Sequence, residues 1–339
     1  MKKIISFLNT DVKIINSYFL LLIILIILVC IGYSSYALFS FSKTSTNIIE
    51  GTVGEIKKSG ADTLIKLTDN RDNSGLYTIT HPKDSTLQIG ATEDITEYRY
   101  RGASPKNYVT FNNEVWRIIG IFPVDDGTGN IENRIKLIRN ESIGNKYWNT
   151  TQVSSTSSYN NWTGATLQIE LNGTYLTKLT SASQNMIGNA KYYLGGYNGQ
   201  TVTTDTMYQY ERKSKNTTSN EFYYGTNPNS WTGKIAIMYA SDYGYAAGEE
   251  CSRTLDYYHY CKSSNWLHNS NVRQWMLTQE SNENNVAWFS HTYGNIQGAY
   301  VGNVVGSGSY AVMPVLYLKS NVKITGGSGT SSDPYTLGI

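Results

Sequence analysis

The longest hydrophobic stretch of the chain lies near its N-terminus. Residues 19–31 are all apolar, and together with residues 32–39 the run reaches about 20 residues. A helix rises about 1.5 Å per residue, so this run covers roughly 30 Å, the thickness of the hydrocarbon core of a bilayer. The pattern therefore predicts a transmembrane helix over residues 18–39.

Basic residues flank this run unequally. Three lysines precede it, and Lys43 is the first base after it. Because positive residues favour the cytoplasmic side, we expect residues 1–17 in the cytoplasm and the C-terminal body outside it. Two alternatives stay open. The run is either a retained signal-anchor or a signal peptide cleaved after Ala37, where Ser35 and Ala37 supply the small residues of a cleavage site.

After the hydrophobic run the chain becomes polar, with weak alternation of apolar and polar positions. Residues 40–94 are expected to be a polar spacer with short strands. Two strongly alternating runs then flank Asn112 and Asn113, a pair that tolerates positive φ in a tight turn. This pattern predicts a β-hairpin, followed by a turn over residues 123–130 and a third strand over residues 134–138.

Two later segments carry apolar residues at helical spacing. Residues 162–172 are expected to form a helix that Gly173 ends. A second helix is expected from about residue 181 to the glycine pair at 195–196, which suits a left-handed C-terminal cap. Residues 197–230 are expected to be a long, polar, tyrosine-rich insertion.

The last third of the chain returns to strand patterns. Four apolar runs predict core strands: 234–239, 286–290, 296–301 and 311–318. The last run contains Pro314, which cannot donate a hydrogen bond to a sheet, so an edge position or a bulge is expected there. Residues 321–339 are expected to form a hairpin tail. The predicted fold class is α+β, with a main domain over residues 95–320.

Composition and charge narrow the class of protein. The chain has 28 basic and 26 acidic residues, a net charge of +2, and no basic block. It therefore lacks the electrostatic footprint of a nucleic-acid-binding protein. Its 28 tyrosines and 7 tryptophans, with abundant short polar residues, suit an exported surface protein, because aromatic side chains supply contact area with a polar handle.

The cysteines and one acidic turn are further candidates for sites of chemistry. Cys251 and Cys261 are the cysteines outside the hydrophobic run, and in an oxidising compartment they predict a disulfide closing a short loop. A catalytic or metal site would need a partnered histidine or a second cysteine pair, and neither is present at ligand spacing. Asp125, Asp126 and Asn130 loosely resemble a calcium loop, but a plain polar turn is the favoured interpretation. No metal and no cofactor are expected.

Seven segments, taken in order, resemble a known family: WRIIGIF, RIKLIRNESIGNKYWN, NWTGATLQIELNGTYL, KIAIMYASDYGYA, CKSSNWL, QWMLT and PVLYLKSNVKITGGSGTSSDPYTL. They are similar to the domain of unknown function DUF6273 of exported proteins from Gram-positive-type bacteria. That domain looks related to C-type lectins and formylglycine-generating enzymes. The resemblance implies a C-type-lectin-like domain with irregular antiparallel sheets and two flanking helices. With the N-terminal helix, it implies a single-pass protein of the bacterial cell membrane whose C-terminal body is extracytoplasmic.

The leading functional hypothesis is a non-enzymatic binding or adhesion module that displays aromatic side chains to a glycan or a protein. Aromatic faces stack on sugar rings, while Asn and Asp side chains hydrogen-bond hydroxyl groups. The candidate ligand-binding residues are Trp231, Asp242, Asn265, Trp266, Trp288 and His291. For each tryptophan, packing in the core is the competing interpretation.

Two other functions stay open at this point. In the formylglycine-generating relatives a cysteine pair does chemistry, so Cys251 and Cys261 would be the redox pair of an enzyme. Their spacing and surroundings do not match that motif, and we assign no catalytic residue. The third alternative is a structural unit of a surface assembly, which the abundance of Tyr, Asn and Gly fits equally well.

Overall fold

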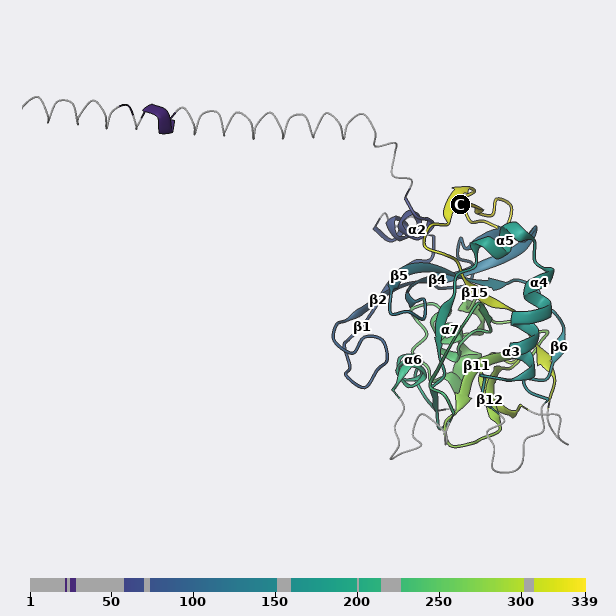
Figure 1. The fold of residues 1–339 in the computed structure, drawn as a ribbon. Helices are drawn as coiled ribbons and strands as arrows, with labels where there is room; N and C mark the ends of the chain where they lie inside the picture. Colours follow the sequence, from purple (N-terminus) through teal and green to yellow (C-terminus); the bar gives the residue numbers. More distant parts are fainter. Residues whose placement is uncertain are drawn as a thin grey trace, which may run out of the picture. The chain divides into compact units, whose positions relative to one another are not determined.

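A computed structural model describes residues 22, 25–28, 58–69, 74–150, 160–199, 201–214, 227–301 and 308–339 (Figure 1). The chain divides into two compact units, Met1–Lys57 and Lys58–Ile339. In the first unit, Leu22 and residues 25–28 are described, and they are helical and exposed. All other statements below concern the second unit.

The predicted fold class is wrong in its helical part. Across the residues that the structure describes, none of the helices has both the length and the apolar character needed to span a membrane. The predicted span, residues 18–39, lies outside the described residues except for Leu22 and residues 25–28. In place of a membrane helix and a lectin-like domain with two flanking helices, the described part of the chain is a mixed α+β body built mostly of sheet, with short helices.

The larger sheet has seven strands, all paired antiparallel, in the order β1-β2-β4-β5-β15-β10 with β3 added to β4. Its strands are β1 (Leu76–His81), β2 (Ile95–Tyr100), β3 (Tyr108–Phe111), β4 (Glu114–Asp125), β5 (Ile131–Arg139), β10 (Ile235–Ala236) and β15 (Val315–Tyr317). The predicted hairpin is confirmed as β3 and β4, whose turn residues Asn112 and Asn113 have φ of 55° and 59°. The third predicted strand is confirmed as β5.

The second sheet has six strands in the order β13-β12-β11-β14-β6, with β8 added to β11. Its strands are β6 (Asn145–Lys146), β8 (Gly196–Tyr197), β11 (Gln274–Glu280), β12 (Val286–Ser290), β13 (Ile296–Tyr300) and β14 (Tyr310–Ala311). Two short pairs complete the strands: β7 (Ala190–Tyr193) with β9 (Ser230–Gly233), and β16 (Lys323–Gly326) with β17 (Thr336–Gly338). The pair β16–β17 confirms the predicted hairpin tail.

The helices are short: α2 (Gly60–Asp69), α3 (Thr166–Glu170), α4 (Leu176–Lys178), α5 (Ser181–Met186), α6 (Thr204–Arg212) and α7 (Ala240–Tyr245). A π turn, η1 (Leu171–Tyr175), joins α3 to α4, and two 3₁₀ segments follow α7, η2 (Leu255–Tyr260) and η3 (Lys262–Ser264). Figure 1 shows α2 beside the C-terminal strands, where the Gly60 N–H donates to the Val322 carbonyl.

The helix boundaries differ from the prediction at two glycine positions. The first helix continues through Gly173 as η1, because the amide of Asn172 donates to the Ile235 carbonyl and accepts from the Lys234 and Ile235 N–H groups. These long-range bonds hold the chain in helical form past the expected stop. The second helix, α5, ends at Met186, and the apolar residues that follow it form β7 rather than a longer helix.

Elements also occur where a spacer and an insertion were expected. The expected spacer does contain a short strand, β1, but this strand is a member of the large sheet and residues 60–69 form the helix α2, so the ordered body begins well before residue 95. Within 197–230, α6 forms with its first turn capped by Thr203, whose side chain accepts from the Thr206 N–H. Its inward face places Glu211 and Arg212 in the interior.

One hydrophobic core runs through both large sheets. Five tryptophans are less than 2% exposed and lie within it: Trp116, Trp148, Trp162, Trp275 and Trp288. The predicted strand over residues 311–318 is divided between the two sheets. Its first part is β14 and its last part is β15, and Pro314 lies between them, where no ladder donor is needed. The proline therefore marks the point at which the chain passes from one sheet to the other.

Candidate functional site

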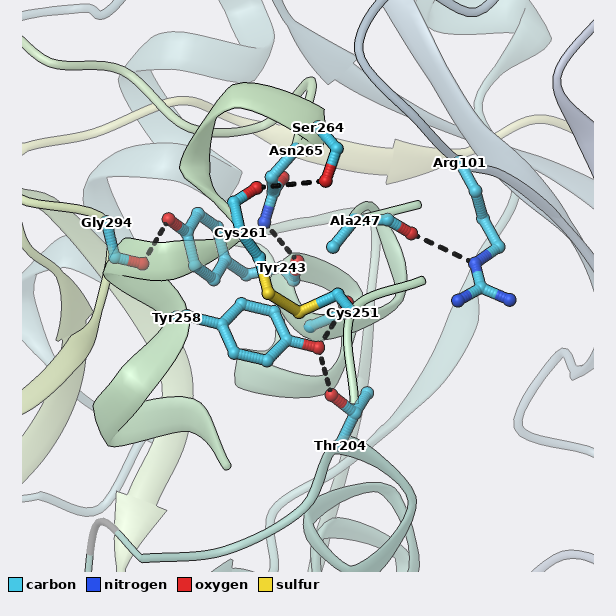
Figure 2. The surroundings of a disulfide bond; sticks show 11 residues. Arg101, Thr204, Tyr243, Ala247, Cys251, Tyr258, Cys261, Ser264, Asn265 and Gly294 are labelled. Carbon is cyan, nitrogen blue, oxygen red and sulfur yellow. Dashed lines mark hydrogen bonds between the residues drawn. A yellow bond between two sulfur atoms is a disulfide. The ribbon is translucent and has the colours of Figure 1, made fainter. Parts of the chain in front are cut away.

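A disulfide loop follows α7. The structure joins Cys251 to Cys261, as predicted, with their Cα atoms 5.7 Å apart (Figure 2). Inside the loop, the buried Tyr258 donates its hydroxyl hydrogen to the Gly244 carbonyl at 2.9 Å and lies 2.8 Å from the Thr204 hydroxyl. The loop is therefore tied covalently at its ends and by hydrogen bonds to α7 and α6. Both sulfur atoms are engaged in the bond, which leaves neither as a thiolate nucleophile.

The turn between β12 and β13 packs against the same loop. Tyr243, on α7, donates its hydroxyl hydrogen to the Gly294 carbonyl at 2.6 Å. Gly294 has φ of +108°, and a β-carbon there would lie 3.1 Å from the Cα of His259 and 2.9 Å from the Cβ of Lys262. Glycine is required both by the positive φ and by this close approach. The β12–β13 turn is thus held directly on η2 and η3.

Three tyrosines project from these two loops, and we name them the tyrosine surface: Tyr257, Tyr260 and Tyr293. Their exposed fractions are 51%, 66% and 68%. The ring of Tyr260 lies 4.0 Å from that of His259, and Tyr293 stacks on His291 at 4.6 Å. Exposed aromatic side chains on a backbone this well anchored have the character of a recognition surface, because little entropy is lost when a ligand covers them.

The spacing of η2 explains which tyrosines are exposed. A 3₁₀ helix repeats every three residues, so Leu255 and Tyr258 share its buried face, while Tyr257 and Tyr260 share a different face that is exposed. This three-residue spacing is visible in the sequence LDYYHY. Sequence reasoning missed it because it gave this loop no helical repeat, and nothing local shows that Tyr293 lies beside it.

The tryptophans proposed as ligand contacts pack against other side chains or hydrogen-bond to the backbone of the body. Trp288 is 1% exposed and donates its indole N–H to the Gln279 carbonyl. Trp231 is partly buried against the Tyr192 ring, 5.6 Å away between centroids. Trp266 donates to the Tyr100 carbonyl at 2.7 Å. The structure thus supports the competing interpretation, packing, for these three rings.

The other three proposed residues are also buried, but two of them support the tyrosine surface. Asn265 donates its amide to the Tyr243 carbonyl and accepts from the Leu267 N–H, which shapes the chain after η3. His291 is 6% exposed and lies under Tyr293. Asp242 belongs to a different cluster, in the interior of the body.

That interior cluster is a network of six buried charges, three acidic and three basic: Glu97, Glu211, Asp242, Arg99, Lys136 and Arg212. We name it the buried charge network. Its links between acids and bases are the pairs Lys136–Asp242 at 2.5 Å, Arg99–Asp242 at 2.9 Å, Arg99–Glu97 at 2.8 Å and Arg212–Glu211 at 3.1 Å. Equal numbers of each sign make the burial electrostatically tolerable.

The network reaches the surface through His81. Its Nε2 lies 3.4 Å from a Glu97 oxygen, its Nδ1 lies 3.4 Å from a carboxylate oxygen of the half-exposed Asp205, and its ring stacks on Tyr208 at 3.6 Å. Burial alone would raise the pKa of Glu97, but Arg99 and His81 hold it well below its usual range. The same competition acts on Asp242, where Lys136 and Arg99 outweigh burial and lower its pKa. Sequence reasoning missed this network because its members are far apart in the chain.

The acidic turn after β4 is a plain turn, as favoured. Asp125 and Asp126 accept hydrogen bonds from the backbone N–H groups of Gly127, Gly129 and Thr128. Within the described part of the chain, no group of three or more His, Cys, Asp or Glu side chains could hold a metal ion. A polar groove of about 470 Å³ beside the turn mixes carboxylates with Arg134 and Lys319.

Comparison with known proteins returned no match to any family model, curated protein or solved structure. The resemblance to DUF6273 and to C-type-lectin-like domains therefore stays a prediction.

Replacing both Cys251 and Cys261 with serine is expected to lower the free energy of unfolding by about 2–3 kcal/mol, because closing this short loop restricts the unfolded chain. Urea denaturation of the full chain measures the change. Reductant should shift the wild-type midpoint to that of the double variant and leave the variant unchanged. A wild-type midpoint that does not respond to reductant would contradict a stabilising disulfide.

Proposed function

We propose that the body is a non-enzymatic recognition module that binds a glycan through the tyrosine surface. The observation that carries the proposal is the exposure of Tyr257, Tyr260 and Tyr293 on two loops fixed to one another and to α7. Tyrosine offers a flat apolar face for stacking on a sugar ring and a hydroxyl for hydrogen bonding. No second function has a comparable observation behind it.

The two loops that carry the tyrosine surface are rigidly held, which favours a role in binding. The disulfide, the Tyr258 hydroxyl and the Tyr243–Gly294 hydrogen bond hold the two loops before any ligand arrives. Preorganised contact residues improve affinity because ordering costs are not incurred on binding. The disulfide also supports a place of action outside the cytoplasm, where such bonds persist.

The polar neighbours fit a hydroxylated ligand. Arg253 lies over the Tyr260 ring, 5.4 Å from its centroid, and His259 lies against the same ring. Both can donate to hydroxyl or carboxylate oxygens at the edge of a stacked sugar. The surface therefore places hydrogen-bond donors beside an exposed aromatic ring.

Truncating the exposed rings is expected to abolish most of the binding. The full chain is first applied to a glycan array, and its best ligand is then titrated by calorimetry. Tyr260→Ala and Tyr293→Ala should each weaken that binding about tenfold or more, as the loss of a central aromatic contact does.

Tyr300→Ala is the matched control. Tyr300 is 49% exposed, but it pairs with Val286 at the far end of the β12–β13 hairpin, away from the turn. Its removal should leave binding unchanged. Absence of any glycan bound at high micromolar concentration, or an equal loss in the Tyr300 variant, would refute the proposal. A protein ligand found in place of a glycan would refute it as well.

A further inference from the structure

The pair Lys136–Asp242 has an unusual setting within the buried charge network. Lys136 lies on β5 and Asp242 on α7, and both side chains are 0% exposed. The Lys136 Nζ is 2.5 Å from Oδ2 of Asp242. The two residues come from distant parts of the chain, so a bond between them would lock the large sheet to α7.

Aromatic rings enclose the lysine nitrogen. The centroids of the Tyr239, Tyr317 and Phe122 rings lie 4.6, 5.3 and 5.4 Å from Nζ. Burial lowers the pKa of Lys136 to about 8, although Asp242 opposes the change. Lys136 and Arg99 hold the pKa of Asp242 below its usual range, so the ion pair is the resting form, and the reaction begins when the proton passes from Nζ to Oδ2 within that contact. A neutral amine held against a carboxyl group is a nucleophile facing its electrophile.

The carboxyl group of Asp242 is held from two sides. Arg99 donates to Oδ1 at 2.9 Å, and the Tyr239 N–H donates to Oδ2 at 2.9 Å. A guanidinium fixed on Oδ1 would stabilise negative charge that develops on that oxygen when a nucleophile adds to Cγ. Holding the amine and the carboxyl group in contact also raises their effective concentration greatly.

We propose that Lys136 and Asp242 condense into an intramolecular amide. The Lys136 ammonium transfers one proton to Oδ2, and the lone pair of Nζ then forms a bond to Cγ while Oδ1 carries the negative charge toward Arg99. The Cγ–Oδ2 bond breaks, and Oδ2 takes a second proton from the nitrogen and leaves as water. The balance is one ammonium and one carboxylate converted to one amide and one water, with no oxidant or co-reactant.

The charges that remain support this step. Removing Lys136 and Asp242 together leaves two acids and two bases that still pair, Glu97 with Arg99 and Glu211 with Arg212. The interior therefore stays balanced, and one costly buried ion pair becomes a neutral amide. The link would also fix α7, whose Tyr243 holds the β12–β13 turn. The amide forms irrespective of what the tyrosine surface binds.

Mass spectrometry of the full chain tests the proposal. After denaturation and reduction, the wild-type chain should be lighter than its sequence mass by one water molecule. A tryptic map should show no cleavage after Lys136, and the peptide that carries it should be joined to the peptide that carries Asp242. The tryptic map assigns the loss of water to the two joined peptides, so changes elsewhere in the chain do not affect the result.

Lys136→Arg is the control variant, because arginine keeps the positive charge but does not form this amide. Its map should contain the Asp242 peptide alone, at its unmodified mass. Separate, unmodified Lys136 and Asp242 peptides from the wild-type chain would overturn the proposal. That result needs only the wild-type protein, so the proposal stays testable even if the variant does not fold.

Discussion

Replacing Glu211 with alanine is expected to lower the free energy of unfolding by about 3–5 kcal/mol, the cost of leaving a buried charge without its partner. Glu211 is 0% exposed and pairs with the buried Arg212. Its carboxylate also accepts from the Ser241 N–H, the Ser241 hydroxyl and the Thr278 hydroxyl. Truncation therefore removes the carboxylate partner of Arg212, whose guanidinium keeps the Tyr208 carbonyl as an acceptor, and takes the Glu211 acceptor away from three donors in the interior. Urea denaturation of the full chain measures the effect.

Glu211→Gln is the matched control for this experiment. Glutamine keeps the shape of the side chain and one acceptor oxygen. The free energy of unfolding should therefore fall clearly less in Glu211→Gln than in Glu211→Ala. Burial raises the pKa of Glu211, although Arg212, Ser241 and Thr278 oppose the change. The folded state thus holds this proton more tightly than the unfolded state, so the contribution of Glu211 to stability is complete below its unfolded pKa and falls as pH rises through the folded value.

The two variants can be compared across that pH range. Relative to Glu211→Gln, the wild-type chain should lose stability as pH rises from about 4.3, the ordinary value for glutamate. Equal stability of the alanine and glutamine variants would contradict the role given to the carboxylate oxygens. A wild-type advantage that grows with pH would contradict the raised pKa.

Replacing Trp148 with alanine should lower the free energy of unfolding by a similar amount, about 3–5 kcal/mol, because the substitution opens a large cavity in the core. Trp148 is 0% exposed, its indole N–H donates to the Met276 carbonyl on β11, and its ring meets that of Trp162 edge-on at 5.1 Å. Its own carbonyl accepts from the Leu167 N–H at the start of α3. The residue therefore joins the second sheet to the helix.

The variant Trp148→Phe distinguishes the contribution of packing volume to stability from that of the indole hydrogen bond. Phenylalanine fills most of the space but leaves the Met276 carbonyl without its donor, so a loss of about 1–3 kcal/mol is expected. Denaturant midpoints of the two variants, compared with wild type at one pH, give the difference. If phenylalanine cost as much as alanine, the indole hydrogen bond rather than packing would dominate at this position.

Local features of the chain could be predicted because short-range sterics and patterns decide them. Asn112 and Asn113 tolerate positive φ, and alternating residues surround them, so the β3–β4 hairpin follows from a few neighbouring residues. The pairing of Cys251 with Cys261 depends on the same short range. Pro314 indicated an irregular strand, but it did not show that the two halves would join different sheets.

The helix limits show where local signals fail. Gly173 is a sound local stop signal, yet the bonds from Asn172 to the backbone of Ile235 carry the helix past it. Residues after Met186 have a helical apolar stripe, but pairing with β9 makes them a strand. In both cases the deciding partner lies far along the chain, 63 residues away for Asn172 and Ile235 and between 37 and 43 residues away for β7 and β9, which no local pattern contains.

By its own pattern, the sequence determined an α+β body, the hairpin, the tail and a disulfide loop rich in tyrosine, since each depends on residues close together in the chain. Only the tertiary structure decided that Trp288 packs in the core while Tyr257, Tyr260 and Tyr293 are exposed on two loops that contact each other. It alone brought Lys136 against Asp242. Burial and charge pairing depend on which distant segments meet, and that is settled by packing of the whole chain.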